Sequence, residues 1–202
     1  MNENIFRFSA ITIFLIGAGI STYHRRKADR ETGEKISPKS EGLPIMVALR
    51  VFGLSLWLSV LAYMINPAWM AWSQVDLPSW MRWTGLGFGL LAVLFSYWVF
   101  SNLGNNVSPS VATRKKHQLV TSGPYRWIRH PLYTMGMVSY FSFAMLSANW
   151  MIALLSLAVF VVLNIRLPQE EAGLIEKFGD EYREYMQRTG RFLPRLVRRS
   201  TT

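Results

Sequence analysis

The sequence contains no cysteine. Disulfide bridges, thiolate nucleophiles and cysteine-ligated metal sites are therefore excluded. The three histidines, His24, His117 and His130, show no metal-ligand spacing, so we expect no metal site. Charge is also scarce, because charged residues make up 17% of the chain against about 25% in an ordinary soluble domain. This balance points away from a soluble protein.

The chain has five long apolar runs. A helix that spans a bilayer needs ~20 predominantly apolar residues, and an open sheet edge cannot be satisfied in lipid. We therefore expect an all-α polytopic membrane protein with five transmembrane helices at about 5–23, 43–65, 80–101, 131–147 and 150–167. The last two should form a tight hairpin across Ala148 and Asn149. Three spans would occupy 1–101, and a loop, the hairpin and a C-terminal helix would occupy 102–202.

The basic residues fall in alternate segments between the predicted spans. They cluster in 24–42, 102–130 and 166–202, whereas 66–79 and 148–149 contain none. This positive-inside pattern predicts an N-terminus outside and a C-terminus in the cytoplasm. Topology and attraction to anionic lipid then explain the net charge of +10, rather than binding to nucleic acid.

The segment 169–189 predicts an amphipathic helix. Its apolar residues recur at helical spacing, namely Leu174, Ile175, Phe178, Tyr182, Tyr185 and Met186. The helix could lie on the cytoplasmic leaflet. It could equally form a wall over a site built by the loop at 102–130, and the two interpretations are compatible.

Residues 123–136 form a dense polar and aromatic cluster at the start of the fourth span, Gly-Pro-Tyr-Arg-Trp-Ile-Arg-His-Pro-Leu-Tyr-Thr-Met-Gly. Pro131 favours the first turn of a helix. His130 would then lie beside free backbone N–H groups, which bind anions at a helix start. The neighbouring arginines would strengthen such a site, and the rings offer faces to a flat ring or a cation. The alternative is a basic, aromatic belt at the membrane interface.

A second ionisable cluster, Glu170 and Glu171, follows Arg166 by about one helical turn. By itself the pair fits a helix start after Pro168, where the helix dipole stabilises acidic residues. Together the two clusters suit S-adenosylmethionine, which carries a carboxylate, an ammonium, a sulfonium, ribose hydroxyls and a purine. Basic, acidic and aromatic side chains address those groups in turn. The residue types alone leave other nucleotides open.

Two further features lie inside the apolar runs. The sequence Gly85-Leu-Gly87-Phe-Gly89 has no strand before it, so we expect small residues that let helices approach rather than a dinucleotide site. Arg50 lies about two turns into the second span. An intramembrane charge is a functional hint, although snorkelling toward the basic side explains it nearly as well.

Two separated motifs carry a family resemblance. Residues 119–133, Leu-Val-Thr-Ser-Gly-Pro-Tyr-Arg-Trp-Ile-Arg-His-Pro-Leu-Tyr, resemble the hallmark of isoprenylcysteine carboxyl methyltransferases and related membrane phospholipid methyltransferases. The second hallmark comprises Arg166, Glu170, Glu171, Leu174, Phe178, Gly179, Glu181 and Tyr182. The likeness covers about 117–185. Pro168 and Gln169 in place of a longer acidic run, and the short chain, are similar to the prokaryotic branch, which implies a prokaryotic inner membrane.

The resemblance implies an integral membrane enzyme that uses S-adenosylmethionine to methylate a lipophilic or small acceptor, at a carboxylate oxygen or a lipid amine. The residues it implies for the cofactor are His117, Gln118, Leu119, Val120, Tyr125, His130, Pro131, Leu132, Tyr133 and Glu170. Arg166 and Arg129 would face the acceptor. Arg166 and Glu171 would be catalytic, with Glu171 or His130 as the base for an amine. An NADPH-dependent enzyme similar to sterol reductases and a non-enzymatic membrane scaffold are the alternatives.

Overall fold

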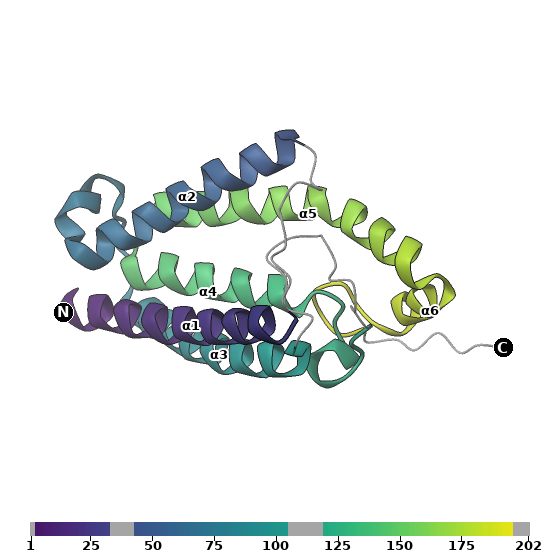
Figure 1. The fold of residues 1–202 in the computed structure, drawn as a ribbon. Helices are drawn as coiled ribbons and strands as arrows, with labels where there is room; N and C mark the ends of the chain where they lie inside the picture. The colour runs from purple at the N-terminus through teal and green to yellow at the C-terminus, as the bar shows by residue number, and fades with distance from the viewer. Residues whose placement is uncertain (1–2, 33–42, 105–118, 196–202) are drawn as a thin grey trace.

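The computed structural model describes residues 3–32, 43–104 and 119–195. Within these residues every named element is a helix, which confirms the all-α prediction there (Figure 1). The elements are α1 (Glu3–Thr32), α2 (Leu43–Ile65), η1 (Pro67–Ser73), α3 (Ser79–Leu103), η3 (Gly123–Arg126), α4 (Pro131–Ser147), α5 (Trp150–Phe178) and α6 (Asp180–Arg188).

The long helices pack in two layers. Helices α1, α3 and α4 lie side by side in one layer, and α2 packs along α5 in the other (Figure 1). The α4–α5 hairpin joins the layers. Its turn is capped by Asn149, whose side chain accepts hydrogen bonds from the backbone N–H groups of Met151 and Ile152 at 3.1 Å each. The predicted tight hairpin is therefore confirmed.

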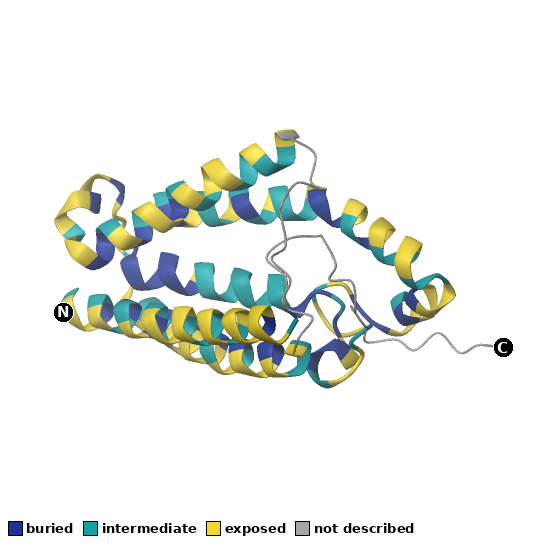
Figure 2. Cartoon of the chain, in the orientation of Figure 1, coloured by how far each residue is buried: buried dark blue, intermediate teal, exposed yellow. Residues whose placement is uncertain are grey.

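Among the described residues, four helices are long and apolar enough to cross a membrane: Glu3–Thr32, Pro44–Ile65, Ser79–Leu103 and Trp150–Phe178. Exposed residues run along α1, α2 and α3 (Figure 2). Among them, Leu15, Leu58 and Leu94 are 62%, 64% and 69% exposed. Apolar surface on this scale suits contact with lipid rather than water.

The predicted fifth span differs from the other four. Helix α4 has 17 residues, so its length of about 26 Å at 1.5 Å per residue falls short of a bilayer core of about 30 Å. Its second half is buried between the two layers, from Ser142 to Ser147. A fifth span therefore stays a prediction.

The glycines of α3 let α4 approach closely. A Cβ atom on Gly85 would lie 2.7 Å from Met145 Cβ, and one on Gly89 would lie 2.6 Å from Ser142 Oγ. The Ser142 hydroxyl also donates a hydrogen bond to the Gly85 carbonyl at 2.7 Å. The expected helix-packing role of this glycine motif is confirmed.

The break between the last two helices lies at Gly179, whereas the sequence predicted it near Pro168. Helix α5 continues through Pro168 to Phe178, and the chain breaks at Gly179, whose φ is +58°. A proline removes one backbone hydrogen bond, but the rest of the helix persists on both sides of it. Glu170 and Glu171 thus lie inside a helix, so the helix-start explanation for this pair is wrong.

Candidate active site

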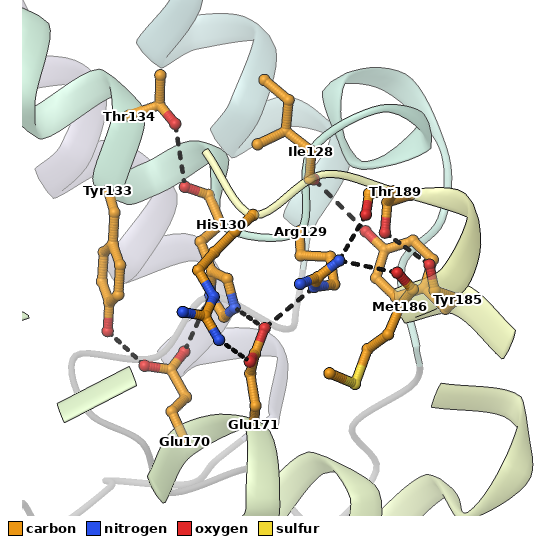
Figure 3. Close-up of polar contacts among 11 residues, drawn as sticks. Ile128, Arg129, His130, Tyr133, Thr134, Glu170, Glu171, Tyr185, Met186 and Thr189 are labelled. Carbon is orange, nitrogen blue, oxygen red and sulfur yellow. Dashed lines mark hydrogen bonds and ion pairs between the residues drawn. The ribbon is translucent and has the colours of Figure 1, made fainter. Parts of the chain in front are cut away.

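The two ionisable clusters meet where α4 begins and α5 leaves its apolar segment. Figure 3 shows residues 128–134 facing Glu170 and Glu171, with the end of α6 closing one side. His130 and Glu171 are 41 positions apart in sequence, yet they are in direct contact. The predicted pairing of the two clusters across the hairpin is therefore what the fold produces.

Glu171 is at the centre of this cluster. Its Oε1 atom accepts a hydrogen bond from Arg129 Nε at 3.0 Å and lies 3.2 Å from His130 Nε2. Its Oε2 atom accepts from Arg191 Nη2 at 2.8 Å. The residue is only 4% exposed. A buried carboxylate is costly unless it is paired, and these basic partners supply the pairing.

Glu170 faces the opposite side of His130. It accepts a hydrogen bond from the Tyr133 hydroxyl, and its Oε1 atom lies 3.7 Å from His130 Nδ1. The rings of His130 and Tyr133 stack with centroids 5.5 Å apart. The Glu170 side chain is 21% exposed against 5% for that of Glu171. Of the two carboxylates, Glu170 is thus the more accessible to a ligand.

The segment after α6 forms a strap along residues 127–130. Gly190 donates its N–H to the Trp127 carbonyl at 3.0 Å and accepts from Arg129 N at 2.9 Å, and the Arg191 carbonyl accepts from His130 N at 3.1 Å. A Cβ atom on Gly190 would lie 1.7 Å from the Leu193 carbonyl oxygen. Sequence reasoning missed this strap. The signal was Gly190 directly after a predicted helix, a common place for a chain to turn.

The strap bears on the expected anion site. Three backbone N–H groups around the start of α4 already have acceptors: His130 N donates to the Arg191 carbonyl, while Tyr133 N and Thr134 N donate to the His130 carbonyl at 3.1 and 3.2 Å. These three N–H groups are therefore not available to an anion. Sequence reasoning failed here because their partners come from the strap and from the helix turn itself.

Arg129 connects the strap to Glu171. Its Nη1 atom donates to the carbonyls of Met186 at 3.0 Å and Thr189 at 2.5 Å, while Nε holds Glu171. The side chain is 8% exposed. Arg129 thus binds Glu171 and two backbone carbonyls of the protein, and its predicted role toward the acceptor stays a prediction.

The other predicted residues lie around this centre. Arg166 is buried at 9% exposure and precedes Glu170 by four positions on α5, so the two side chains share one helix face. Tyr125 and Pro131 are buried, and Leu119, Val120 and Leu132 are half-buried. His117 and Gln118 lie outside the described residues.

Two tyrosines of α6 complete the wall. The Tyr185 hydroxyl donates to the Tyr125 carbonyl at 2.6 Å. The Tyr182 hydroxyl is buried and has no hydrogen-bond partner among the described residues. Burial raises the pKa of Tyr182, and the nearby Glu171 carboxylate raises it further. Tyr182 is therefore a neutral hydroxyl with an unused donor beside the site.

The chain is similar to several known proteins. Residues 85–176, which run from α3 through α4 into α5, match the isoprenylcysteine carboxyl methyltransferase family. The match covers 92 of the 202 residues, so the chain is similar to this family over somewhat less than half of its length. It is 32% identical over 114 residues to a protein-S-isoprenylcysteine O-methyltransferase of Schizosaccharomyces pombe, covering 55% of this chain and 48% of that one.

A bacterial relative carries a different name. The chain is 33% identical over 70 residues to methanethiol S-methyltransferase 1 of Bradyrhizobium diazoefficiens, covering 35% of this chain and 24% of that one. The chain thus spans about half or less of the length of these curated relatives.

A solved structure shares the fold of this chain. The structure is of a eukaryotic intramembrane Ras methyltransferase, an isoprenylcysteine carboxyl methyltransferase. The TM-score is 0.58 at 23% identity, over 92% of this chain and 67% of that one. With four helices suited to cross a bilayer, the protein is an integral membrane protein.

Proposed function

We propose that the protein is a methyltransferase that uses S-adenosylmethionine to methylate a lipophilic or small acceptor. The observation that carries this proposal is the contact of His130 with both Glu170 and Glu171, just beyond the apolar segment of α5. In the predicted topology this place lies on the cytoplasmic side, where a soluble cofactor and a membrane-borne acceptor can meet.

The residues around the site fit the cofactor in three respects. The partly exposed Glu170 can accept hydrogen bonds from ribose hydroxyls or an ammonium group. The buried Tyr182 hydroxyl can donate to a carboxylate. The stacked rings of His130 and Tyr133 offer an aromatic edge to a purine. When bound, the cofactor supplies a methyl group on a positively charged sulfur.

The remaining cofactor contacts follow from the family resemblance. Tyr125, Pro131 and Leu132 would form the wall on the α4 side. Leu119 and Val120 would extend it, together with His117 and Gln118, which precede the described segment.

Glu171 is best suited to position His130. Both of its oxygens are engaged by arginine side chains, and its Oε1 atom also contacts the imidazole. If the acceptor were an amine, a base would have to take up its proton. His130, which lies between the two carboxylates, is then the better candidate.

Arg166 is the proposed acceptor-orienting residue. Its guanidinium can bind a carboxylate in bidentate geometry. A carboxylate acceptor needs no general base, only orientation and proximity. Such an acceptor approaching a positively charged methyl donor loses charge as it reacts, which a water-poor site favours. Arg166 is buried at 9% exposure, which provides that setting.

Two measurements test the proposal. Isothermal titration of the purified protein should show binding of S-adenosylmethionine and none of NADPH, which separates the methyltransferase from the reductase alternative. Methyl-labelled cofactor should then be offered with a prenylated cysteine that has a free carboxylate, with a small thiol, and with extracted lipids. We expect label in one product class, and expect Arg166→Ala to lose transfer while it keeps cofactor binding. Transfer at the wild-type rate by Arg166→Ala would remove the acceptor role from this residue.

A further inference from the structure

We propose that a cavity between the C-terminal ends of α1 and α3 binds the phosphate-bearing headgroup of an anionic membrane phospholipid. The two helices pack side by side and end near each other (Figure 1). The cavity has a volume of ≈ 260 Å³ and is lined by Tyr23, His24, Lys27, Tyr97, Ser101 and Gly104. These residues are distinct from those around Glu171, so the inference is independent of the proposed methyl transfer.

The lining has the chemistry of a phosphate site. Three hydroxyls, from Tyr23, Tyr97 and Ser101, can donate hydrogen bonds, and the Lys27 ammonium adds a positive charge. Among the described residues the lining contains no carboxylate that would repel an anion. Hydrogen bonds between ionised groups are about twice as strong as neutral ones. A phosphate oxygen would therefore find several donors and one cation at close range.

His24 provides an independent indication of a ligand. Its Nε2 atom is buried and has no hydrogen-bond partner among the described residues. The ring is held in place by aromatic neighbours: it stacks on Phe100 with centroids 5.8 Å apart and meets Tyr23 edge-on at 5.1 Å. A buried polar atom without a partner costs free energy. A small rotation of the imidazole that brings Nε2 to the cavity would let a headgroup oxygen remove that cost.

Lys27 is available for such a ligand. Its described ion pair is with Glu31 at 4.0 Å, and the two side chains are 55% and 44% exposed. Exposed pairs of this kind contribute little to stability. Lys27 can therefore turn toward a phosphate at small cost.

The position and size of the cavity favour a lipid as the source of the phosphate. Tyr23 ends the apolar run of α1, and tyrosines gather at membrane–water interfaces. Tyr23 and Tyr97 are 63% and 61% exposed on the outer surface of the bundle. Pockets that enclose a whole small ligand measure about 300–1,000 Å³. A cavity of ≈ 260 Å³ suits a headgroup whose acyl chains lie outside, along the helices.

Native mass spectrometry of the full chain in a neutral detergent can test this site without a charged membrane surface. On titration with a short-chain phosphatidylglycerol, we expect one lipid adduct to form first. Lys27→Gln should weaken the apparent affinity for this lipid by about tenfold or more, because a hydrogen bond to a charged group contributes about that much to binding. Tyr97→Phe removes a single hydroxyl that would donate to the charged phosphate, and it should also weaken the affinity by about tenfold. Both side chains are more than half exposed, so both variants should fold.

Arg26→Gln is the matched control. It removes the same charge from an exposed neighbour that does not line the cavity, so affinity should change by no more than about twofold. Equal loss in Lys27→Gln and Arg26→Gln would overturn the proposal. Equal binding of short-chain phosphatidylcholine would overturn the anionic preference. Excess inorganic phosphate should leave the adduct in place, and displacement of the lipid by it would assign the cavity to a free phosphate ion instead.

Discussion

His130 Nε2 lies 3.2 Å from Glu171 Oε1, while His130 Nδ1 lies 3.7 Å from Glu170 Oε1. The imidazole of His130, the residue directly before α4, thus contacts two consecutive carboxylates of α5. The two carboxylates differ in surroundings, because Glu171 is enclosed by basic side chains and Glu170 is partly open. We expect their substitution to have different effects.

Glu171→Gln should destabilise the protein more than Glu170→Gln. The substitution leaves Arg129 buried without its carboxylate partner, which costs ~3 kcal/mol or more for a buried pair. Thermal unfolding of the purified variants measures the difference. Glu176→Gln, an exposed residue one and a half turns further along α5, is the control and should be close to wild type. An unfolding temperature for Glu171→Gln equal to that of the control would contradict this role.

Gly190→Ala should disrupt the strap. The added Cβ atom would lie 1.7 Å from the Leu193 carbonyl oxygen, so the chain must move away from residues 127–130. We expect weaker cofactor binding and a lower unfolding temperature. Gly173→Ala is the matched control, because a Cβ atom there meets nothing within 4 Å. It should stabilise α5 by up to about 1 kcal/mol. If both variants bound the cofactor like wild type, the strap would not matter to the site.

Arg82→Gln should loosen the end of the bundle that lies far from the site. Arg82 donates to both oxygens of Glu3 at 2.7 Å each and to the Leu146 carbonyl at 2.6 Å, and its guanidinium lies 4.1 Å from the Phe6 ring centre. Losing charged hydrogen bonds of this kind costs about 1.5–3 kcal/mol each. The unfolding temperature should fall, while cofactor affinity stays unchanged. Arg50→Gln removes an exposed arginine and should alter neither quantity. A fall in cofactor affinity with Arg82→Gln would show that this end is coupled to the site.

Alkaline pH should destabilise the protein through buried tyrosines. Burial raises the pKa of Tyr125, Tyr182 and Tyr185 above the ordinary value of about 10. Each holds its proton more tightly in the folded state, so this stability is present below about pH 10 and is lost as pH rises further. Tyr182→Phe should reduce the loss of unfolding temperature between about pH 9 and pH 11, whereas Tyr23→Phe, at an exposed residue, should not. If the unfolding temperatures of Tyr182→Phe and wild type fell equally with pH, Tyr182 would not be a source of the alkaline destabilisation.

The parts of the fold that local patterns determine could be predicted from the sequence. Apolar runs located the long helices, and Ala148 with Asn149 located the hairpin turn. The pairing of 123–136 with Glu170 and Glu171 followed from the hairpin, since its two outer ends must lie together. Family resemblance then supplied the chemistry that residue types alone left open.

The parts that depend on contacts distant in sequence could not be predicted. The strap pairs Gly190 with residues 127–129, about 60 positions away, and no local pattern encodes that pairing. It also occupies backbone N–H groups that seemed free at the start of α4. The continuation of α5 through Pro168 was missed because a proline is a strong stop signal when only neighbours are considered.

Titration of S-adenosylmethionine into the purified protein and its Glu170→Gln variant tests the central claim most directly. We expect that wild type binds the cofactor, that Glu170→Gln weakens binding about tenfold or more through loss of charged hydrogen bonds, and that Glu176→Gln binds like wild type. Equal affinity in Glu170→Gln and wild type would contradict the placement of the cofactor beside His130 and Glu170.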